Sequence, residues 1–170
     1  MPPEPSRYRV ALWRSLREIG AVYIQNSVCI LPDFPEHREK FQEFSRKILE
    51  YGGESILFSA QGLDENEDGK IVARFNAERD LEYREVVEEC LSFLKEIEKE
   101  TEAENFIFAE LEENEGNLQR LSAWAAKVKK RDFFGAPMRD EAETMLFRCQ
   151  EALEGFASRI CQAEGEIQSK

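Results

Sequence analysis

Arginine side chains near the N-terminus are the residues whose type and spacing point most directly to chemistry. Arg7, Arg14 and Arg17 are seven and three positions apart, so a helix would place them on one face, and Arg9 lies nearby. The planar guanidinium group offers paired donors that suit a tetrahedral oxyanion such as sulfate or phosphate. The pattern predicts that these arginines contact an anion or nucleic acid. The alternative is a solvated helix face balanced by acidic neighbours.

A second set of basic residues lies where two parts of the chain are predicted to meet, and it comprises Arg74, Arg79, Lys130 and Arg131. A pocket between two parts is a common place for a small ligand, so this set is a candidate binding pocket. Structural ion pairs are the alternative. The basic run 127–131 also ends a predicted helix, where its charge would satisfy the helix dipole without any ligand. The adjacent Phe133 and Phe134 would nevertheless suit an anionic partner.

The sequence contains no constellation of residues typical of catalysis or of a metal centre. Carboxylates are abundant but form no recognisable catalytic pair, and no glycine-rich phosphate loop, nucleophile elbow or zinc-protease motif is present. His37 is the only histidine, and the acidic segment 62–69 lacks the ligand spacing and the closing Glu of a calcium loop. We therefore predict a protein that is not an enzyme and that has no cofactor, no metal and no catalytic residue.

The cysteines are predicted to be structural and reduced, because no CxxC pair occurs among Cys29, Cys90, Cys149 and Cys161. The alternative is an oxidation-sensitive thiol at Cys29 or Cys90. The apolar neighbours of both residues predict burial, which argues against reactivity.

The bulk composition restricts the class of partner. A formal net charge of −12 opposes sequence-independent binding to DNA, so DNA contact is expected only through a local basic patch. No run of about 18 apolar residues occurs, and the N-terminus lacks the layout of a signal peptide. These features predict a cytoplasmic protein without membrane contact.

The first elements expected are a helix, a hairpin, a second helix and a strand. A helix over residues 6–19 would begin at an N-cap Ser6 and end at Gly20. The stretch GAVYIQNSVCILP, residues 20–32, predicts strands 21–24 and 28–31 joined by a turn at 25–27, and one continuous strand with a bulge is the alternative. A second helix is expected over 35–51, and a short buried strand over 55–58.

Residues 62–69 are predicted to form a solvated acidic loop and residues 70–75 one more strand. From residue 78 onward, apolar residues alternate in steps of three and four, which is typical of helices packed at a shallow angle. Asn114 and Gly116 are expected to bend or break the second of these helices. The three apolar series are Tyr83, Val87, Cys90, Leu94 and Ile97; Ile107, Leu111, Leu118, Leu121, Ala125 and Val128; and Ala142, Leu146, Cys149, Leu153, Phe156, Ile160 and Ala163.

These elements predict an α+β protein with four segments. Residues 1–62 would form an αββαβ unit, which is the ferredoxin-like plan without its first strand. Residues 63–76 would hold the acidic loop and the possible extra strand. Residues 77–165 would form an antiparallel bundle of about three helices, and residues 166–170 a frayed tail. The inner sheet edge is expected to be covered by the bundle or by another copy of the protein.

Four segments carry a resemblance to a known family. SRYRVALWRSLREIGAVYIQNSVCILPD and YGGESILFSA resemble the N-terminal domain of the ChrB chromate-resistance regulators, and KIVARFNAERDLEYREVVEEC and DFFGAPMRDEAETML resemble the helical part of that domain. The first segment is more distantly similar to PaaX-type regulators and to CRISPR spacer-acquisition proteins. Members of the ChrB family usually carry an apolar strand before the proline-rich turn, here residues 2–5, and a second, C-terminal domain. Neither is seen in this sequence.

The resemblance implies a non-catalytic regulatory or sensing module that couples chromate, another oxyanion or a partner to transcriptional control, acting as a homodimer. The second hypothesis is a nucleic-acid-binding ferredoxin-like protein that uses the arginine-bearing helix. The third is a protein-interaction module without a ligand of its own.

Overall fold

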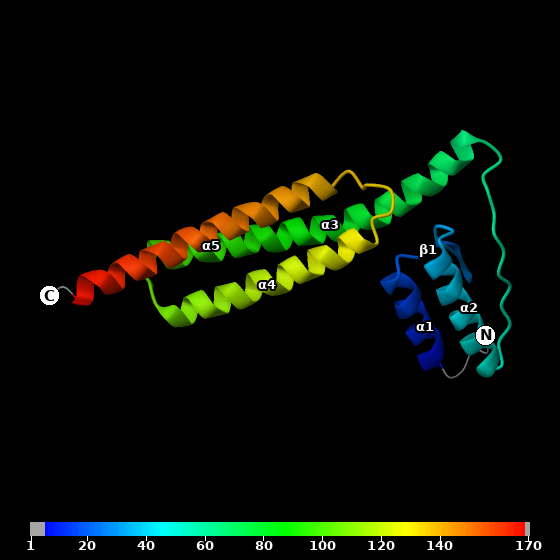
Figure 1. Ribbon diagram of the computed structural model, residues 1–170, viewed down its shortest axis with the longest axis horizontal. Coiled ribbons are helices and arrows are strands. Elements are labelled where there is room, and N and C mark those ends of the chain that lie inside the picture. Colours follow the sequence, from blue (N-terminus) through cyan, green and yellow to red (C-terminus); the bar gives the residue numbers. More distant parts are fainter. Residues whose placement is uncertain (1–5, 169–170) are drawn as a thin grey trace. The chain divides into compact units, whose positions relative to one another are not determined.

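The computed structural model describes residues 6–168, and it is mixed α+β with five helices and one two-stranded antiparallel sheet in that range (Figure 1). The side chains of residues 6, 164 and 166–168 lie outside the description. The chain divides into two units, residues 1–75 and 76–170, and each unit is described by itself below.

Helix α1, Ser6–Glu18, opens the first unit and ends at glycine as predicted. Gly20 adopts φ +88° and donates its N–H to Arg17 O, while Ala21 N–H bonds Leu16 O, both at 3.0 Å. This is the Schellman motif, in which a left-handed residue satisfies the last carbonyl groups of a helix. Leu16 and Ala21 are both buried, so the helix end also contributes to the core. The N-cap predicted for Ser6 lies outside the described side chains.

The stretch 20–32 is a hairpin, as the sequence analysis predicted. Strand β1, Val22–Gln25, pairs antiparallel with β2, Val28–Ile30, in the register Val22↔Ile30 and Tyr23↔Cys29. The alternative of one continuous strand is wrong, because two separate strands pair here, and the register of the pairing shifts between Tyr23 and Gln25. Ser27 adopts φ +67° in the turn.

Helix α2, Pro35–Glu50, completes a small core in the first unit. It also ends in a Schellman motif, because Gly52 at φ +72° bonds Leu49 O and Gly53 bonds Ile48 O. Leu16, Ala21 and Phe44 are the buried centre of this core, and half-buried residues from α1, the hairpin and α2 pack around them.

The strand predicted over residues 55–58 is not formed, and the αββαβ plan is therefore incomplete in the described residues. Ser55 Oγ bonds Ser45 Oγ at 2.7 Å and Ser59 Oγ donates to Asp33 Oδ2 at 2.7 Å, but no ladder joins this segment to the hairpin. Ile56 is 87% exposed and Phe58 is 74% exposed. The prediction of a buried strand was wrong because local apolar character alone cannot supply a pairing partner.

The acidic loop and extra strand predicted within residues 63–76 were also largely wrong. Helix α3, Glu65–Glu102, covers most of that range. Asp64 accepts the N–H of Glu67 through Oδ1 at 3.0 Å, which makes it the N-cap, and the acidic first turn suits the positive end of the helix dipole. The acidic run is therefore a helix start, and residues 70–75 continue the helix.

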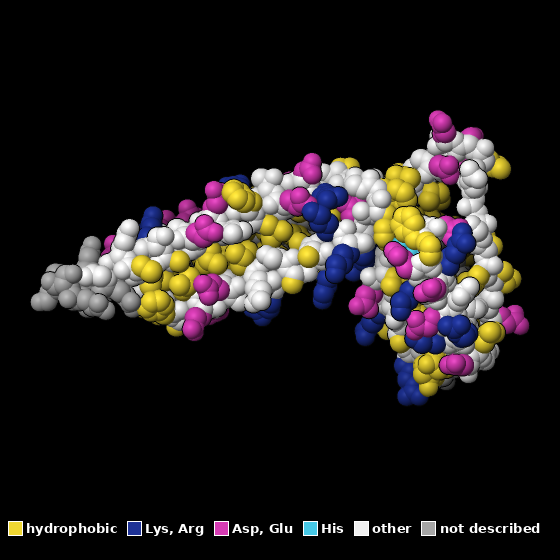
Figure 2. Space-filling view, viewed as in Figure 1, with side chains coloured by type: hydrophobic (Ala, Val, Ile, Leu, Met, Phe, Trp, Pro, Cys, Tyr) yellow, Lys and Arg dark blue, Asp and Glu magenta, His cyan; other side chains and the backbone are white. Residues whose placement is uncertain are grey.

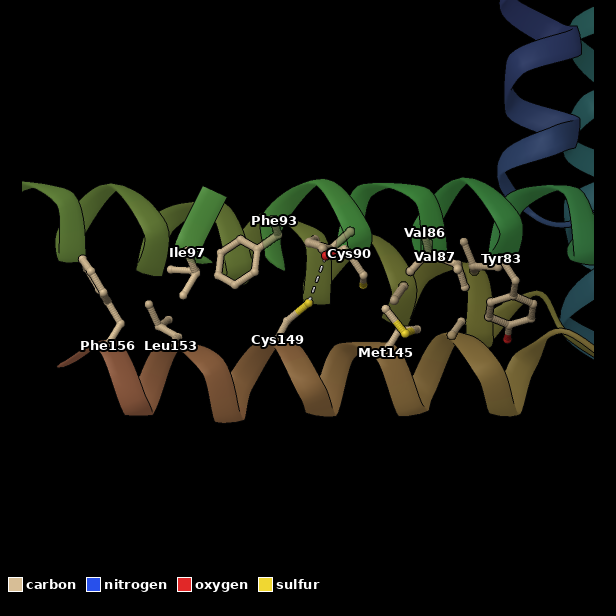
Figure 3. Packing of buried hydrophobic residues seen from close by; sticks show 14 of the residues in the cluster. Tyr83, Val86, Val87, Cys90, Phe93, Ile97, Met145, Cys149, Leu153 and Phe156 are labelled. Atoms are coloured by element: carbon tan, nitrogen blue, oxygen red, sulfur yellow. Dashed lines mark hydrogen bonds between the residues drawn. The ribbon is translucent and has the colours of Figure 1, made fainter. Parts of the chain in front are cut away.

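The second unit contains three helices that share one core. The C-terminal part of α3, then α4, Phe108–Lys130, and α5, Arg139–Gln168, lie side by side and alternate in direction (Figure 1). Figure 3 shows the buried side chains of α3 pointing toward those of α5. The predicted apolar series supply most of this core, which contains Tyr83, Val86, Val87, Cys90, Phe93, Ile97, Leu121, Ala125, Val128, Ala136, Ala142, Met145, Cys149, Leu153, Phe156 and Ile160.

Two local predictions in the second unit were wrong. Helix α4 continues through Asn114 and Gly116, and Asn114 is buried with its Nδ2 donating to Glu110 O at 2.8 Å. Helix α5 extends to Gln168, so residues 166–168 belong to the helix, whereas residues 169–170 lie outside the described part. Within the described part, no helix is both long and apolar enough to span a bilayer.

Candidate functional site

The four arginines predicted on the first helix are all exposed on α1. Arg7 donates to the hydroxyl of Tyr8 at 3.0 Å, and Tyr8 stacks on Tyr51 with ring centroids 3.9 Å apart. Arg9 and Arg14 have no ion-pair or hydrogen-bond partner among the described residues. Their guanidinium groups are therefore available to an acceptor from outside the unit.

Apolar side chains accompany the arginines on the solvent side of α1. Val10 is 44% exposed and Trp13 is 45% exposed, and the Arg17 guanidinium lies 5.0 Å from the centre of the Trp13 ring. Helical spacing places Val10, Trp13, Arg14 and Arg17 together on one exposed side of α1. We call these four residues the α1 basic face. In Figure 2 basic and acidic side chains intermingle on the surface of this unit.

The structure brings two of the four predicted junction residues, Arg79 and Arg131, to one carboxylate in the second unit. Arg79 Nε lies 3.2 Å from Glu82 Oε2, and Arg131 Nη2 lies 3.0 Å from Glu82 Oε1. The Arg79 side chain is only 3% exposed. A buried arginine that shares a carboxylate with a second arginine is a structural ion pair, so this arrangement favours the alternative that the sequence analysis left open.

The other two predicted junction residues do not join this ion-pair group. Arg74 is exposed in the first unit, and Lys130 is exposed at the C-terminal end of α4. The neighbouring Lys129 forms an ion pair with Glu143 of α5 at 2.8 Å. The basic run therefore lies where cations stabilise a helix C-terminus.

A carboxylate cluster that the sequence analysis missed holds the connection between α4 and α5. The side chain of Asp132 is fully buried, with Oδ2 accepting from the Tyr83 hydroxyl at 3.2 Å and Oδ1 accepting from Ala136 N at 2.9 Å. Burial and the nearby Asp132 charge raise the pKa of Tyr83 above its ordinary value. Asp80 of α3 accepts the N–H of Met138 at 2.8 Å.

This cluster stabilises the connection between α4 and α5, because the carboxylates of Asp80 and Asp132 both accept hydrogen bonds from groups of the same unit. The sequence signal was the spacing of three residues between the half-buried Asp80 and the buried Tyr83, which places them next to each other on α3. The partner of Asp80 is 58 residues away and the partner of Tyr83 is 49 residues away, so only the packed helices reveal the contacts.

The cysteines lie in different environments and none is in a disulfide. Cys90 and Cys149 are buried in the second core, where Cys149 Sγ lies 3.5 Å from Cys90 O (Figure 3). Cys29 is half-buried in the hairpin and Cys161 is exposed on α5. Within residues 6–168, no three His, Cys, Asp or Glu side chains gather in a way that could hold a metal ion.

Comparisons with known proteins place the chain in a family. A model of the family described as Protein ChrB, N-terminal, matches residues 9–167. The curated Protein ChrB of Cupriavidus metallidurans is 26% identical over 104 residues, which covers 61% of this chain and 32% of that protein. The matched region is thus about a third of the relative's length. No solved structure matches. Because the family match spans nearly all of the described residues, this chain belongs to the ChrB N-terminal family.

Proposed function

We propose that this chain is a non-catalytic regulatory module of chromate resistance, and that its α1 basic face contacts chromate or another tetrahedral oxyanion. Membership of the ChrB N-terminal family supports the biological setting. The relative extends well beyond the matched region, so coupling to transcriptional control would involve parts outside this match.

We choose the site by comparing which arginines already have a carboxylate partner. Arg79 and Arg131 already share the carboxylate of Glu82, so an anion would have to compete with a built-in acceptor there. Arg14 has no such acceptor among the described residues, and Glu18 is the only acidic residue of α1. An oxyanion needs donors that are not already neutralised.

The spacing on α1 further restricts which arginines can hold one anion together. Arg14 and Arg17 are three residues apart, about 5 Å along the axis, so both guanidinium groups can converge on one tetrahedral anion. Arg7 lies about 10 Å from Arg14 along the axis, which is about twice the separation of Arg14 and Arg17. We therefore assign the anion contact chiefly to Arg14 and Arg17.

The test is the melting temperature of the full chain with increasing chromate, and with sulfate as an isosteric anion that is not an oxidant. A ligand that binds only the folded state raises the melting temperature. We expect the rise in wild type and in Arg46→Ala, which removes an exposed arginine of α2, and its loss in Arg14→Ala. Equal rises in all three proteins would contradict the proposed site.

A second candidate function is contact with nucleic acid, which the exposed Trp13 beside Arg14 and Arg17 favours. Aromatic rings stack on bases while arginines neutralise phosphates. Fluorescence anisotropy with a labelled single strand should then show binding that weakens steeply with salt and is reduced in Trp13→Ala. Binding unaffected by Trp13→Ala would contradict this candidate.

We also propose a ferredoxin-like fold for the first unit. A ferredoxin-like sheet would require strands in addition to β1 and β2, supplied by residues outside the described hairpin. A cytoplasmic location and a homodimeric state fit a regulator of this class.

A further inference from the structure

A groove between α3 and α4 combines acidic and apolar side chains. Its volume is about 470 Å³. Its lining includes Glu89, Phe93 and Glu96 of α3, and Asn114, Leu121 and Trp124 of α4. The lining also contains Arg120, whose guanidinium bonds Asn117 Oδ1.

The polar side chains of the groove present acceptors without enough donors. Glu89 has no ion-pair partner among the described residues, while Glu96 pairs with Lys99 at 2.8 Å. Asn114 is only 3% exposed, and its Nδ2 is used by Glu110 O. Its Oδ1 accepts no hydrogen bond within the described part of the chain. Carboxylate and amide oxygens that have no donor within the chain can accept N–H groups from a partner, so this groove is suited to a donor-rich, cationic occupant.

The spacing of the groove residues matches a helix. Glu89 and Glu96 are seven residues apart on α3, as are Asn114 and Leu121 on α4. A seven-residue repeat on two neighbouring helices is the pattern that receives a third helix along the groove. Phe93, Leu121 and Trp124 supply the apolar contact area that such a helix would need.

Helix α1 has the matching properties. Its basic face combines apolar Val10 and Trp13 with Arg14 and Arg17, and Arg7 and Arg14 repeat over the same seven residues as Glu89 and Glu96. Each pair spans about 10.5 Å of helix. Charge is also complementary, because α1 carries four arginines and one glutamate, whereas residues 76–170 carry 23 acidic and 13 basic residues.

We propose that the α3–α4 groove binds α1 of a second copy of this chain. Each copy has one α1 and one groove, so two copies can satisfy both contacts in a closed two-fold dimer. The inference stands apart from the proposed anion contact but uses the same helix. An anion held by Arg14 and Arg17 would therefore compete with the groove and loosen the dimer.

The test is sedimentation equilibrium of the full chain at low and high salt. We expect a dimer that weakens with salt, and at least a roughly tenfold higher dissociation constant in Glu89→Lys/Glu96→Lys and in Arg14→Glu/Arg17→Glu. Combining the four substitutions should restore the dimer, because the charges are exchanged. The control Glu88→Lys/Glu98→Lys makes the same charge change on exposed positions outside the groove and should keep the dimer. Circular dichroism checks that each variant is folded.

Four outcomes would overturn the proposal. Wild type could remain a monomer at low salt, the dimer could survive the Glu89→Lys/Glu96→Lys change, or the combined variant could fail to recover while remaining folded. A monomer in which a cross-link joins α1 to the groove of the same chain would also refute it. Oxyanion binding measured in Glu89→Lys/Glu96→Lys, which keeps α1 intact, separates failure of this proposal from failure of the proposed function.

Discussion

Asp80 Oδ1 accepts the backbone N–H of Met138 at 2.8 Å, so a carboxylate on α3 caps the start of α5. The first N–H groups of a helix have no partner within the helix, and an anion there also meets the positive end of the helix dipole. One side chain thus joins two helices through residues that are 58 positions apart in sequence.

Replacing Asp80 with Ala should lower the free energy of unfolding by about 1–2 kcal/mol, because it removes both the cap and the favourable charge. Urea denaturation measures this change. Asp140→Ala is the matched control, since Asp140 lies in the first turn of α5 but is exposed and should cost only about 0.3–0.5 kcal/mol. Equal losses in both variants would show that the hydrogen bond to Met138 has no special role.

Replacing Glu104 with Gly should stabilise the protein by about 0.5–1 kcal/mol. Helix α3 ends in the same motif as α1 and α2, with Glu104 N bonding Thr101 O and Asn105 N bonding Glu100 O. Here, however, the residue with positive φ is a glutamate at +52° and not a glycine. A residue with a Cβ is strained in that region.

The control for this prediction is Gly52→Ala, at the corresponding position after α2 with φ +72°. It introduces the strain that Glu104→Gly removes and should destabilise by about 1 kcal/mol. Thermal unfolding, monitored by circular dichroism, measures both the expected gain and the expected loss of stability. A loss of stability in Glu104→Gly would mean that contacts of the Glu104 side chain outweigh the strain.

The thiols should react with a disulfide reagent in a fixed order in the folded protein. Cys161 is exposed and should react first, Cys29 should be slower because burial raises its pKa, and Cys90 and Cys149 should react only after unfolding. The neighbouring Cys149 thiol and burial also raise the pKa of Cys90. Fast reaction of a third thiol in native conditions would indicate that the second core opens more readily than its packing implies.

The sequence predicted the elements whose signals are local, and it failed where distant partners decide. The turn residues of 25–27 identified the hairpin, and Gly20 and Gly52 identified two helix ends. Residues 70–75 were misread as a strand because this short segment is mostly apolar and contains the β-branched Ile71 and Val72, whereas the buried residues Phe75, Arg79 and Tyr83 continue at helical spacing beyond it. The N-cap signal of Asp64 followed by Glu67 was present and was overlooked.

In the candidate site, too, local signals were predicted correctly and contacts between distant residues were not. The type and face of the α1 arginines follow from spacing alone, and the structure leaves them exposed. The role of Arg79 and Arg131 depends on Glu82, and the Arg131–Glu82 contact joins residues 49 positions apart. Helix packing creates that contact, so the sequence could name the arginines but could not choose between a pocket and an ion pair.

The hydroxyl of Tyr83 predicts a dependence of stability on alkaline pH. Its pKa is raised in the folded protein, first by burial and then by Asp132, whose Oδ2 accepts the hydroxyl proton. A group with a raised folded pKa contributes stability that is fully present below its unfolded pKa, about 10 for tyrosine, and that is lost as the pH rises above it. The free energy of unfolding should therefore fall more steeply above pH 10 in wild type than in Tyr83→Phe, when both are measured by urea denaturation.

Tyr51→Phe, which removes the hydroxyl of an exposed residue, is the control, and it should follow wild type. If Tyr83→Phe also follows wild type above pH 10, then ionisation of Tyr83 is not linked to unfolding, and the buried contact with Asp132 does not have the electrostatic role assigned to it.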